Sequence, residues 1–180
     1  MPKRIKVLDK EFEVSIPGKE IQKAIAIVAD KMNKDLAGKK VIFLGILNGA
    51  FMFAGDLFKK INFPCQVTFL KLASYQGTSS TGKLKSLIGL NEDLEGKTVV
   101  VLEDIVDSGL TLEHIIKQLK GYEPEDIKIA TLLFKPEAYK KDIKIDYIGI
   151  EIPNDFIIGY GLDYNGYARN LEDIYTLVKS

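Results

Sequence analysis

The sequence has little of what marks several common classes of protein. Its one cysteine, Cys65, excludes an internal disulfide and suits a reducing cytoplasm. The 25 Lys and Arg residues balance the 25 Asp and Glu residues, so no overall basic field attracts nucleic acid. No apolar run approaches the roughly 18 residues of a membrane span, and no apolar segment follows the basic residues near Met1. We therefore expect a cytoplasmic protein with no signal peptide that binds neither nucleic acid nor membrane.

What the chain does contain is a regular alternation of strand and helix patterns. At 180 residues it is long enough to bury a proper core in one domain. The alternation predicts an α/β fold with a doubly wound, mainly parallel sheet. The expected helices are 17–36, 50–61 and 110–121, the expected strands are 41–47, 66–73, 84–90, 99–102, 127–134, 146–151 and 174–178, and 7–15 is a short extended segment.

The most informative stretch is VVVLEDIVDSGLT, from Val99 to Thr111. Its apolar start shows no polar alternation, which is typical of a strand buried on both faces of a parallel sheet. The apolar spacing that follows predicts a helix beginning near residues 108–111. The segment between them therefore lies at the carboxyl end of a central strand, where open α/β sheets bind ligands.

The residues of this segment suit a ligand with two different ends. Ser108, Gly109 and Thr111 offer hydroxyls and open backbone N–H groups at a helix N-terminus, which can hold a phosphate. Acids at 103, 104 and 107 crowd the same turn, although carboxylates repel phosphate. Carboxylates accept hydrogen bonds from ribose hydroxyls, bind Mg²⁺ and stabilise positive charge. A phosphorylated ribose that reacts through an oxocarbenium-like state fits both ends.

This stretch resembles the phosphoribosyl-pyrophosphate signature of the type I phosphoribosyltransferases. Along nearly its whole length the chain resembles the hypoxanthine-guanine branch of that family, through SYQGTSSTG (74–82), LLFK (132–135) and IPNDFIIGYGLDYNGYARNL (152–171). The resemblance implies a single domain with the type I phosphoribosyltransferase fold. Its core would span about residues 16–150, and residues 1–15 and 151–180 would form a small hood. It also implies a homodimer or a homotetramer.

The resemblance implies a purine-salvage reaction with Mg²⁺ as the cofactor. The 5-phosphoribosyl group of phosphoribosyl pyrophosphate would move to N9 of a 6-oxopurine, hypoxanthine or guanine, giving IMP or GMP and pyrophosphate. Asp107 would be the catalytic acid or base near the purine N7. Ribose and the 5′-phosphate would bind at Glu103, Asp104, Ile105, Asp107, Ser108, Gly109, Leu110 and Thr111, and the metal at Glu103, Asp104 and Asp163.

Pyrophosphate is expected where the strand ending at Leu47 meets a helix, because the amides of Asn48 and Gly49 can face phosphate there. The resemblance also implies a cis peptide bond at 47–48. Many family members carry Lys or Arg at the position of Asn48, so this chain would rely mainly on backbone and Mg²⁺ contacts. Arg169 is the other expected anion partner, because its planar guanidinium suits phosphate oxygens. The alternative for Arg169 is a surface ion pair with Glu172 or Asp173.

The later motifs supply the expected purine site. Lys135 follows a buried strand and precedes Pro136. Its ammonium can donate a hydrogen bond to O6 of hypoxanthine or guanine, whereas the amino group of adenine could not accept that bond. Phe156 would stack on the base, the backbone of Ile157 would contact its edge, and Asp163 would bind the Mg²⁺ of pyrophosphate. The alternatives are that Lys135 is an ordinary surface lysine and that Phe156 is a core phenylalanine. The resemblance further implies that Ser74 and Tyr75 shield the reacting centre from water.

The sequence also bears on three alternative functions. The run Gly77–Lys83 (GTSSTGK) matches a P-loop in all but its last position, but Leu84 lacks the hydroxyl that binds Mg²⁺, and a strand pattern follows where a helix is required. A nucleic-acid-binding regulator on the same fold would need a basic face, of which the balanced charge gives no sign. A xanthine-preferring transferase stays open, because hypoxanthine, guanine and xanthine all carry O6.

Overall fold

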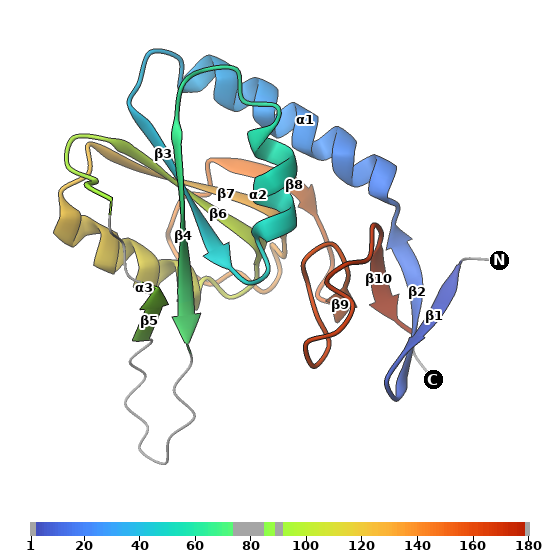
Figure 1. Cartoon of the computed structure of the whole chain (residues 1–180). Helices are drawn as coiled ribbons and strands as arrows, with labels where there is room; N and C mark the ends of the chain where they lie inside the picture. Colours follow the sequence, from blue (N-terminus) through green and yellow to red (C-terminus); the bar gives the residue numbers. More distant parts are fainter. Residues whose placement is uncertain (1–2, 74–84, 89–91, 179–180) are drawn as a thin grey trace.

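The computed structural model describes residues 3–73, 85–88 and 92–178. Its larger sheet has six strands in the order β5-β4-β3-β6-β7-β8, as Figure 1 shows. Every neighbouring pair is parallel except β4 with β5, which is antiparallel. The predicted mainly parallel sheet is therefore confirmed. The strands are β3 (Val41–Leu47), β4 (Gln66–Ala73), β5 (Lys85–Ile88), β6 (Thr98–Val106), β7 (Asp126–Phe134) and β8 (Tyr147–Glu151).

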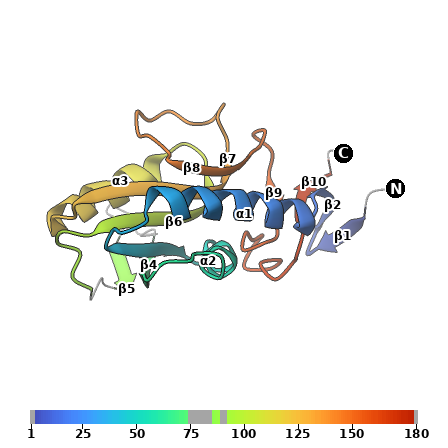
Figure 2. The ribbon, with the colours of Figure 1, turned by 90° about the horizontal axis from the view of Figure 1, so that it is seen from above.

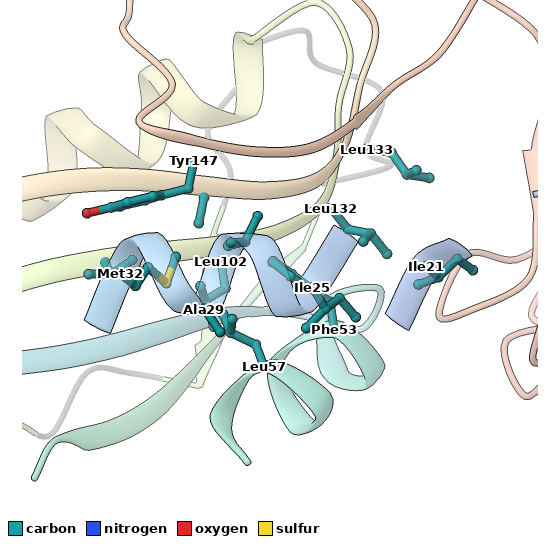
Figure 3. Close-up of a cluster of buried hydrophobic side chains, with 14 of the residues drawn as sticks. Ile21, Ile25, Ala29, Met32, Phe53, Leu57, Leu102, Leu132, Leu133 and Tyr147 are labelled. Carbon is teal, nitrogen blue, oxygen red and sulfur yellow. The ribbon is translucent and has the colours of Figure 1, made fainter. Parts of the chain in front are cut away.

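Helices cover both faces of this sheet because its central strands are apolar on both sides. Along β6, Val100 and Leu102 pack against helices α1 and α2, whereas Val99 and Val101 pack against helix α3. Figure 3 shows the first layer, where the side chains of α1 and α2 meet Leu102 over the sheet. The helices are α1 (Gly18–Asp35), α2 (Phe51–Phe58) and α3 (Leu110–Leu119).

The two ends of the chain build a second, antiparallel sheet, which confirms the predicted hood. Its order is β1-β2-β10-β9, so β10 from the C-terminal end lies between β2 and β9. Figure 2 shows this sheet beyond the N-terminal end of α1. Phe12, Ile158 and Tyr175 form its own small core. The strands are β1 (Arg4–Val7), β2 (Lys10–Ile16), β9 (Ile157–Ile158) and β10 (Ile174–Leu177).

Several predicted boundaries were wrong. The predicted extended segment 7–15 is part of a hairpin of two strands, β1 and β2, over residues 4–16. The chain turns between them because Leu8 takes a left-handed backbone conformation (φ 55°) that no Gly or Asn signals. Helix α2 ends at Phe58, and α3 ends at Leu119 before the 3₁₀ turn η1 (Lys120–Tyr122). The two-residue strand β9 was not predicted, because its segment is rich in Gly, Asn and Asp. No helix in the described ranges is long and apolar enough to cross a membrane.

Candidate active site

The end of β6 and the start of α3 enclose a pocket of about 200 Å³. Glu103 contributes to its wall although the residue is only 6% exposed. Burial, followed by the neighbouring charge of Asp104, raises the pKa of Glu103 well above its ordinary value. The Glu103 carboxyl therefore sits in a desolvated site. The pocket is lined by Glu103, Ile105, Val106, Asp107, Ser108, Gly109, Leu110, Thr111 and Leu112.

The loop before α3 has the geometry of an anion site. Gly109 is the N-cap of α3 with φ 83°, and no described side chain caps the helix, so N–H groups of its first turn face the loop. A Cβ at position 109 would lie 2.6 Å from the ring of Tyr139 and 2.8 Å from the Cγ of Lys141. A glycine at position 109 therefore allows the side chains of the segment 139–141 to pack directly against the backbone of the loop.

The turn at the end of β3 meets the acids of β6 directly. The Leu47–Asn48 peptide bond is cis, as the resemblance implied, and Gly49 follows it. A Cβ at Gly49 would collide with the Asp104 carboxylate, whose Oδ1 accepts a hydrogen bond of 3.0 Å from the Ile105 N–H. The structure thus brings the expected pyrophosphate turn and the ribose acids into contact.

The pKa of Asp104 is raised to about 6. Burial is the main cause, while the backbone N–H groups and then Arg169 act in the opposite direction, and Asp163 adds a smaller increase. These interactions place Arg169 and Asp163 within electrostatic reach of Asp104, although they lie in the C-terminal segment. Asp104 is consequently an acid whose charge state changes close to neutral pH.

Arg169 makes an ion pair that the sequence did not indicate. Its Nη2 lies 2.6 Å from Asp163 Oδ1, and its Nη1 donates to the Gly161 carbonyl oxygen at 2.6 Å. The alternative prediction, an ion pair of Arg169 with Glu172 or Asp173, was therefore wrong. The other Asp163 oxygen accepts a 2.7 Å hydrogen bond from the Gly166 N–H, so both side chains are fixed in place.

Lys135 and Asp107 lie together because of strand register. Val106 pairs with Phe134 in the β6–β7 ladder, so the residues that follow them emerge side by side. The Lys135 Nζ lies 3.8 Å from Asp107 Oδ2 and donates to the Asp155 carbonyl oxygen at 2.9 Å. Lys135 is only 7% exposed, so the alternative of an ordinary surface lysine was wrong.

Phe156 follows Asp155 and lies at the edge of this group. It is 47% exposed, so the alternative of a core phenylalanine was wrong. Its ring packs edge-on against Tyr164, with the centroids 6.0 Å apart, and leaves part of its surface to solvent. Ile157 is buried in β9 and pairs with Thr176. Ser74 and Tyr75, as well as the P-loop-like run, lie outside the described residues.

The residues present fit one mode of Mg²⁺ binding. No group of three or more His, Cys, Asp or Glu side chains that could hold a metal occurs in the described part of the chain. A cage made by protein side chains is therefore absent there. Mg²⁺ in phosphate-handling sites is instead usually held by one or two carboxylates together with substrate oxygens and water. The adjacent Glu103 and Asp104, with Asp163 in electrostatic reach, match that mode.

Sequence reasoning missed several residues that build this site. Asp155 contributes a backbone carbonyl, for which no side-chain pattern gives a signal. Tyr139 and Lys141 lie against Gly109 in the loop before α3. Gly161 lies against Gly49 so closely that a Cβ would collide with the Gly49 carbonyl oxygen. The glycines flanking Tyr160 were the one available signal for that close approach.

Comparison with known proteins agrees with this arrangement. Residues 17–165 match the family model described as the phosphoribosyl transferase domain. A hypoxanthine-guanine phosphoribosyltransferase of Staphylococcus aureus is 39% identical over 166 residues, covering 92% of this chain and 93% of the relative. One from Mycobacterium tuberculosis is 37% identical over 171 residues, covering 91% and 85%. A crystal structure of a Bacillus anthracis hypoxanthine-guanine phosphoribosyltransferase has a TM-score of 0.85 and 35% identity, covering 93% of this chain and 97% of that one.

The fold and site thus define a phosphoribosyltransferase, with a parallel sheet that carries an acid pair and the loop before α3, beside an antiparallel hood. Within that class, the identity and coverage are decisive. The chain belongs to the hypoxanthine-guanine phosphoribosyltransferase family.

Proposed function

We propose that this enzyme transfers the 5-phosphoribosyl group of phosphoribosyl pyrophosphate to N9 of hypoxanthine and of guanine, giving IMP or GMP and pyrophosphate. The observation that carries the proposal is the pairing of Lys135 with Asp107, 3.8 Å apart at the ends of adjacent strands. Lys135 can donate a hydrogen bond to a bound purine base, and Asp107 beside it can exchange a proton with that base. Both lie next to the loop before α3, where we expect the sugar phosphate, so one site offers what the two substrates require together.

The sugar phosphate would bind along the 200 Å³ pocket. N–H groups at the start of α3, from Ser108 to Thr111, would donate to the 5′-phosphate, helped by the positive end of the helix dipole. Glu103 and Asp104 would accept hydrogen bonds from the ribose 2′- and 3′-hydroxyls, and Ile105 and Leu110 would contribute through their backbone. Because the carboxylates are desolvated, they would also stabilise positive charge developing on the ring.

The purine would lie between Lys135 and the exposed face of Phe156. The Lys135 ammonium would donate to O6, and the backbone at Ile157 would contact the ring edge. As purine N9 bonds to C1′, the bond from C1′ to pyrophosphate breaks, and pyrophosphate leaves with the electron pair. The proton on N7 would pass to the Asp107 carboxylate, whose side chain is 54% exposed and therefore accessible to a base.

The leaving group would be held by the turn at Leu47, Asn48 and Gly49 together with Arg169. Asn48 has no charge, so neutralisation would come from Arg169 and from the metal. Mg²⁺ held by Glu103, Asp104 and Asp163 with substrate oxygens would offset the negative charge of pyrophosphate. Ser74 and Tyr75, which follow β4 in the sequence, would exclude water from the reacting carbon.

The test is an ultraviolet assay of the purified chain with phosphoribosyl pyrophosphate, Mg²⁺ and each of hypoxanthine, guanine, xanthine and adenine. Turnover of hypoxanthine and guanine with none of adenine is expected, because adenine has no O6 to accept from Lys135. The ratio of guanine to xanthine turnover measures what surrounds purine C2. Absence of turnover with every base would overturn the proposal, and salt-sensitive RNA binding in that case would support a regulator.

We also propose a cytoplasmic enzyme that self-associates as a dimer or tetramer. The free thiol of Cys65 suits a reducing compartment, and the family resemblance implies the self-association. Sedimentation velocity at several concentrations measures the oligomeric state, and a monomer throughout would contradict this part of the proposal.

A further inference from the structure

The hood touches the core at a turn of unusual backbone conformation. Gly159, Tyr160 and Gly161 have φ values of 99°, 47° and 98°, so the chain folds sharply and Tyr160 projects from the turn. Gly161 lies directly on the Gly49 carbonyl, where any Cβ would collide. The expected pyrophosphate turn is therefore in contact with hood backbone, and its position depends on where residues 159–161 are held.

Tyr160 links this turn by hydrogen bonds to α1 and α2, the two helices that cover one face of the sheet. The residue is only 2% exposed. Its hydroxyl donates to Asp56 Oδ2 on α2 and accepts a 3.1 Å hydrogen bond from the Gln22 Nε2 on α1. The same Gln22 amide donates to Asp56 Oδ2 at 2.6 Å, which closes a triangle of three side chains. The hood turn, α1 and α2 thus meet at one polar cluster.

The cluster contains a charged aspartate, Asp56, which also forms an ion pair with an exposed lysine. The Lys59 ammonium lies 2.6 Å from the other Asp56 oxygen. Burial acts to raise the pKa of Asp56, but the hydrogen bonds from Lys59, Tyr160 and Gln22 outweigh it, so the pKa lies below its ordinary value. Asp56 is therefore ionised at neutral pH, and its bond from the Tyr160 hydroxyl is charge-assisted, the stronger kind of hydrogen bond.

A continuous set of contacts links this cluster to the site. Helix α2 starts at Phe51, just after Gly49, so Asp56 and the pyrophosphate turn belong to one connected element. Gly161 presses on Gly49 from the hood side, and the Asp104 carboxylate presses on it from the sheet side. The Gly161 carbonyl also accepts from Arg169. A shift of the Tyr160 turn would therefore move both the Gly49 backbone and Arg169.

We propose that Tyr160, held by Asp56 and Gln22, is a positioning residue that sets the geometry of the pyrophosphate site. It acts through Gly161 on the Gly49 turn and on Arg169. The inference rests on the proposed function, since it assigns pyrophosphate to this turn. The expected 5′-phosphate loop follows β6 and Lys135 follows β7, apart from the cluster. Phe156 and Ile157 come shortly before the turn, but β9 is held by its own pairing with β10, so we expect the purine site to be little affected.

The test compares Tyr160→Phe with Tyr164→Phe. Each variant removes one hydroxyl that donates to an aspartate and keeps the ring, but the Tyr164 hydroxyl bonds Asp9 within the hood, at 2.8 Å, and not the core. For Tyr160→Phe we expect the KM values for phosphoribosyl pyrophosphate and, in the reverse reaction, for pyrophosphate to rise about five- to tenfold, with kcat and the KM for hypoxanthine within about twofold. Tyr164→Phe should leave all four within about twofold.

Three results would overturn the proposal. They are unchanged KM values for both pyrophosphate-bearing substrates, an equal rise in the KM for hypoxanthine, and the same pattern in Tyr164→Phe. If Tyr160→Phe does not fold, Gln22→Leu removes the amide that donates to both partners and should give the same split. If the unmodified chain shows no transfer, the proposed function fails. Calorimetric titration with magnesium pyrophosphate then still tests whether Tyr160→Phe binds more weakly than the unmodified chain.

Discussion

At the scale of single residues, the site brings together a buried lysine and an exposed aspartate. The Lys135 side chain is 9% exposed and the Asp107 side chain 54% exposed, although their charged atoms lie 3.8 Å apart. A lysine that is buried and held by the Asp155 carbonyl is suited to fixed recognition of one acceptor atom. An exposed carboxylate beside it is free to approach a bound base. The two side chains can therefore divide recognition from proton transfer.

Asp107→Asn is expected to lower kcat by about two orders of magnitude or more with little change in KM, since the amide cannot accept the proton but keeps the shape. Steady-state kinetics with hypoxanthine measure both constants. Glu103→Gln serves as the comparison, because it should mainly raise the KM for phosphoribosyl pyrophosphate. Identical kinetic profiles for the two variants would contradict their separate roles.

Asp104→Asn should stabilise the substrate-free protein in a pH-dependent way. Burial raises the pKa of Asp104 to about 6 from an ordinary value of 3.8. The native state therefore binds the proton more tightly than the unfolded state, and this group lowers the free energy of unfolding as pH rises from about 4 to about 6. We expect the melting temperature to increase by about 2–4 °C at pH 7.5, equivalent to about 1 kcal/mol, and by less at pH 4.5.

Thermal unfolding followed by circular dichroism at both pH values measures this effect. Asp9→Asn is the control, because a hydrogen bond from Tyr164 lowers the pKa of Asp9 and its charge is therefore stabilising above that pKa. Its melting temperature should not increase at pH 7.5. A gain for Asp104→Asn that is equal at both pH values would contradict the assigned cause.

At the scale of elements, the loop before α3, which we expect to bind phosphate, is held by a segment that lies outside it. The N-cap glycine of α3 carries no capping side chain, and the segment 139–141 packs against it. The Lys141 ammonium also lies 2.7 Å from Glu113 in the first turn of α3. The loop is thus packed between its own helix and the segment after β7, and we expect this packing to restrict the orientation of its amides.

Gly109→Ala should raise the KM for phosphoribosyl pyrophosphate at least tenfold. The new Cβ would displace Tyr139 or Lys141 and strain a backbone at φ 83°. Gly38→Ala is the matched control, because Gly38 has φ 77° with nothing within 4 Å of an added Cβ. That variant should lose about 1–3 kcal/mol of stability from strain alone and keep its KM. Equal KM values in the two variants would show that the contacts at Gly109 do not shape the site.

At the scale of the whole molecule, the hood joins the two ends of the chain and closes on α1. Strand β2 pairs with β10, whose residues lie more than a hundred positions away in the sequence. Asp173 also accepts a 2.9 Å hydrogen bond from the Gly18 N–H, in the first turn of a helix that has no side-chain cap at Pro17. We propose that these links make hood and core one folding unit.

Asp173→Ala should lower the free energy of unfolding by about 0.5–2 kcal/mol, the usual cost of a lost helix cap. Urea denaturation followed by circular dichroism and by tyrosine fluorescence measures it. Asp173→Asn keeps an acceptor oxygen and should lose less. Both probes should follow one transition, and two separate transitions would contradict a single folding unit.

Local pattern was enough to predict most elements and the class of the site. The apolar run ending in Glu103 and Asp104, followed by Ser108 to Thr111, determines a buried strand, an acid pair and an anion loop within one short stretch. Boundaries failed where no residue marked the change, as at Leu8 in the first hairpin. The unpredicted β9 has only two residues, too few for periodicity to reveal a strand.

By itself, the sequence determined the mainly parallel sheet, the strand and helix on either side of the loop before α3, and the family resemblance, because each is visible in local patterns and motifs. Only the tertiary structure decided that Arg169 pairs with Asp163, that Gly49 touches Asp104, and that Tyr160 joins two helices. Tyr160 is separated in the sequence from Asp56 by 104 positions and from Gln22 by 138 positions. Such contacts depend on how the sheet, helices and hood pack together, and hydrophobic periodicity specifies which face of an element is buried but not which polar groups meet across it.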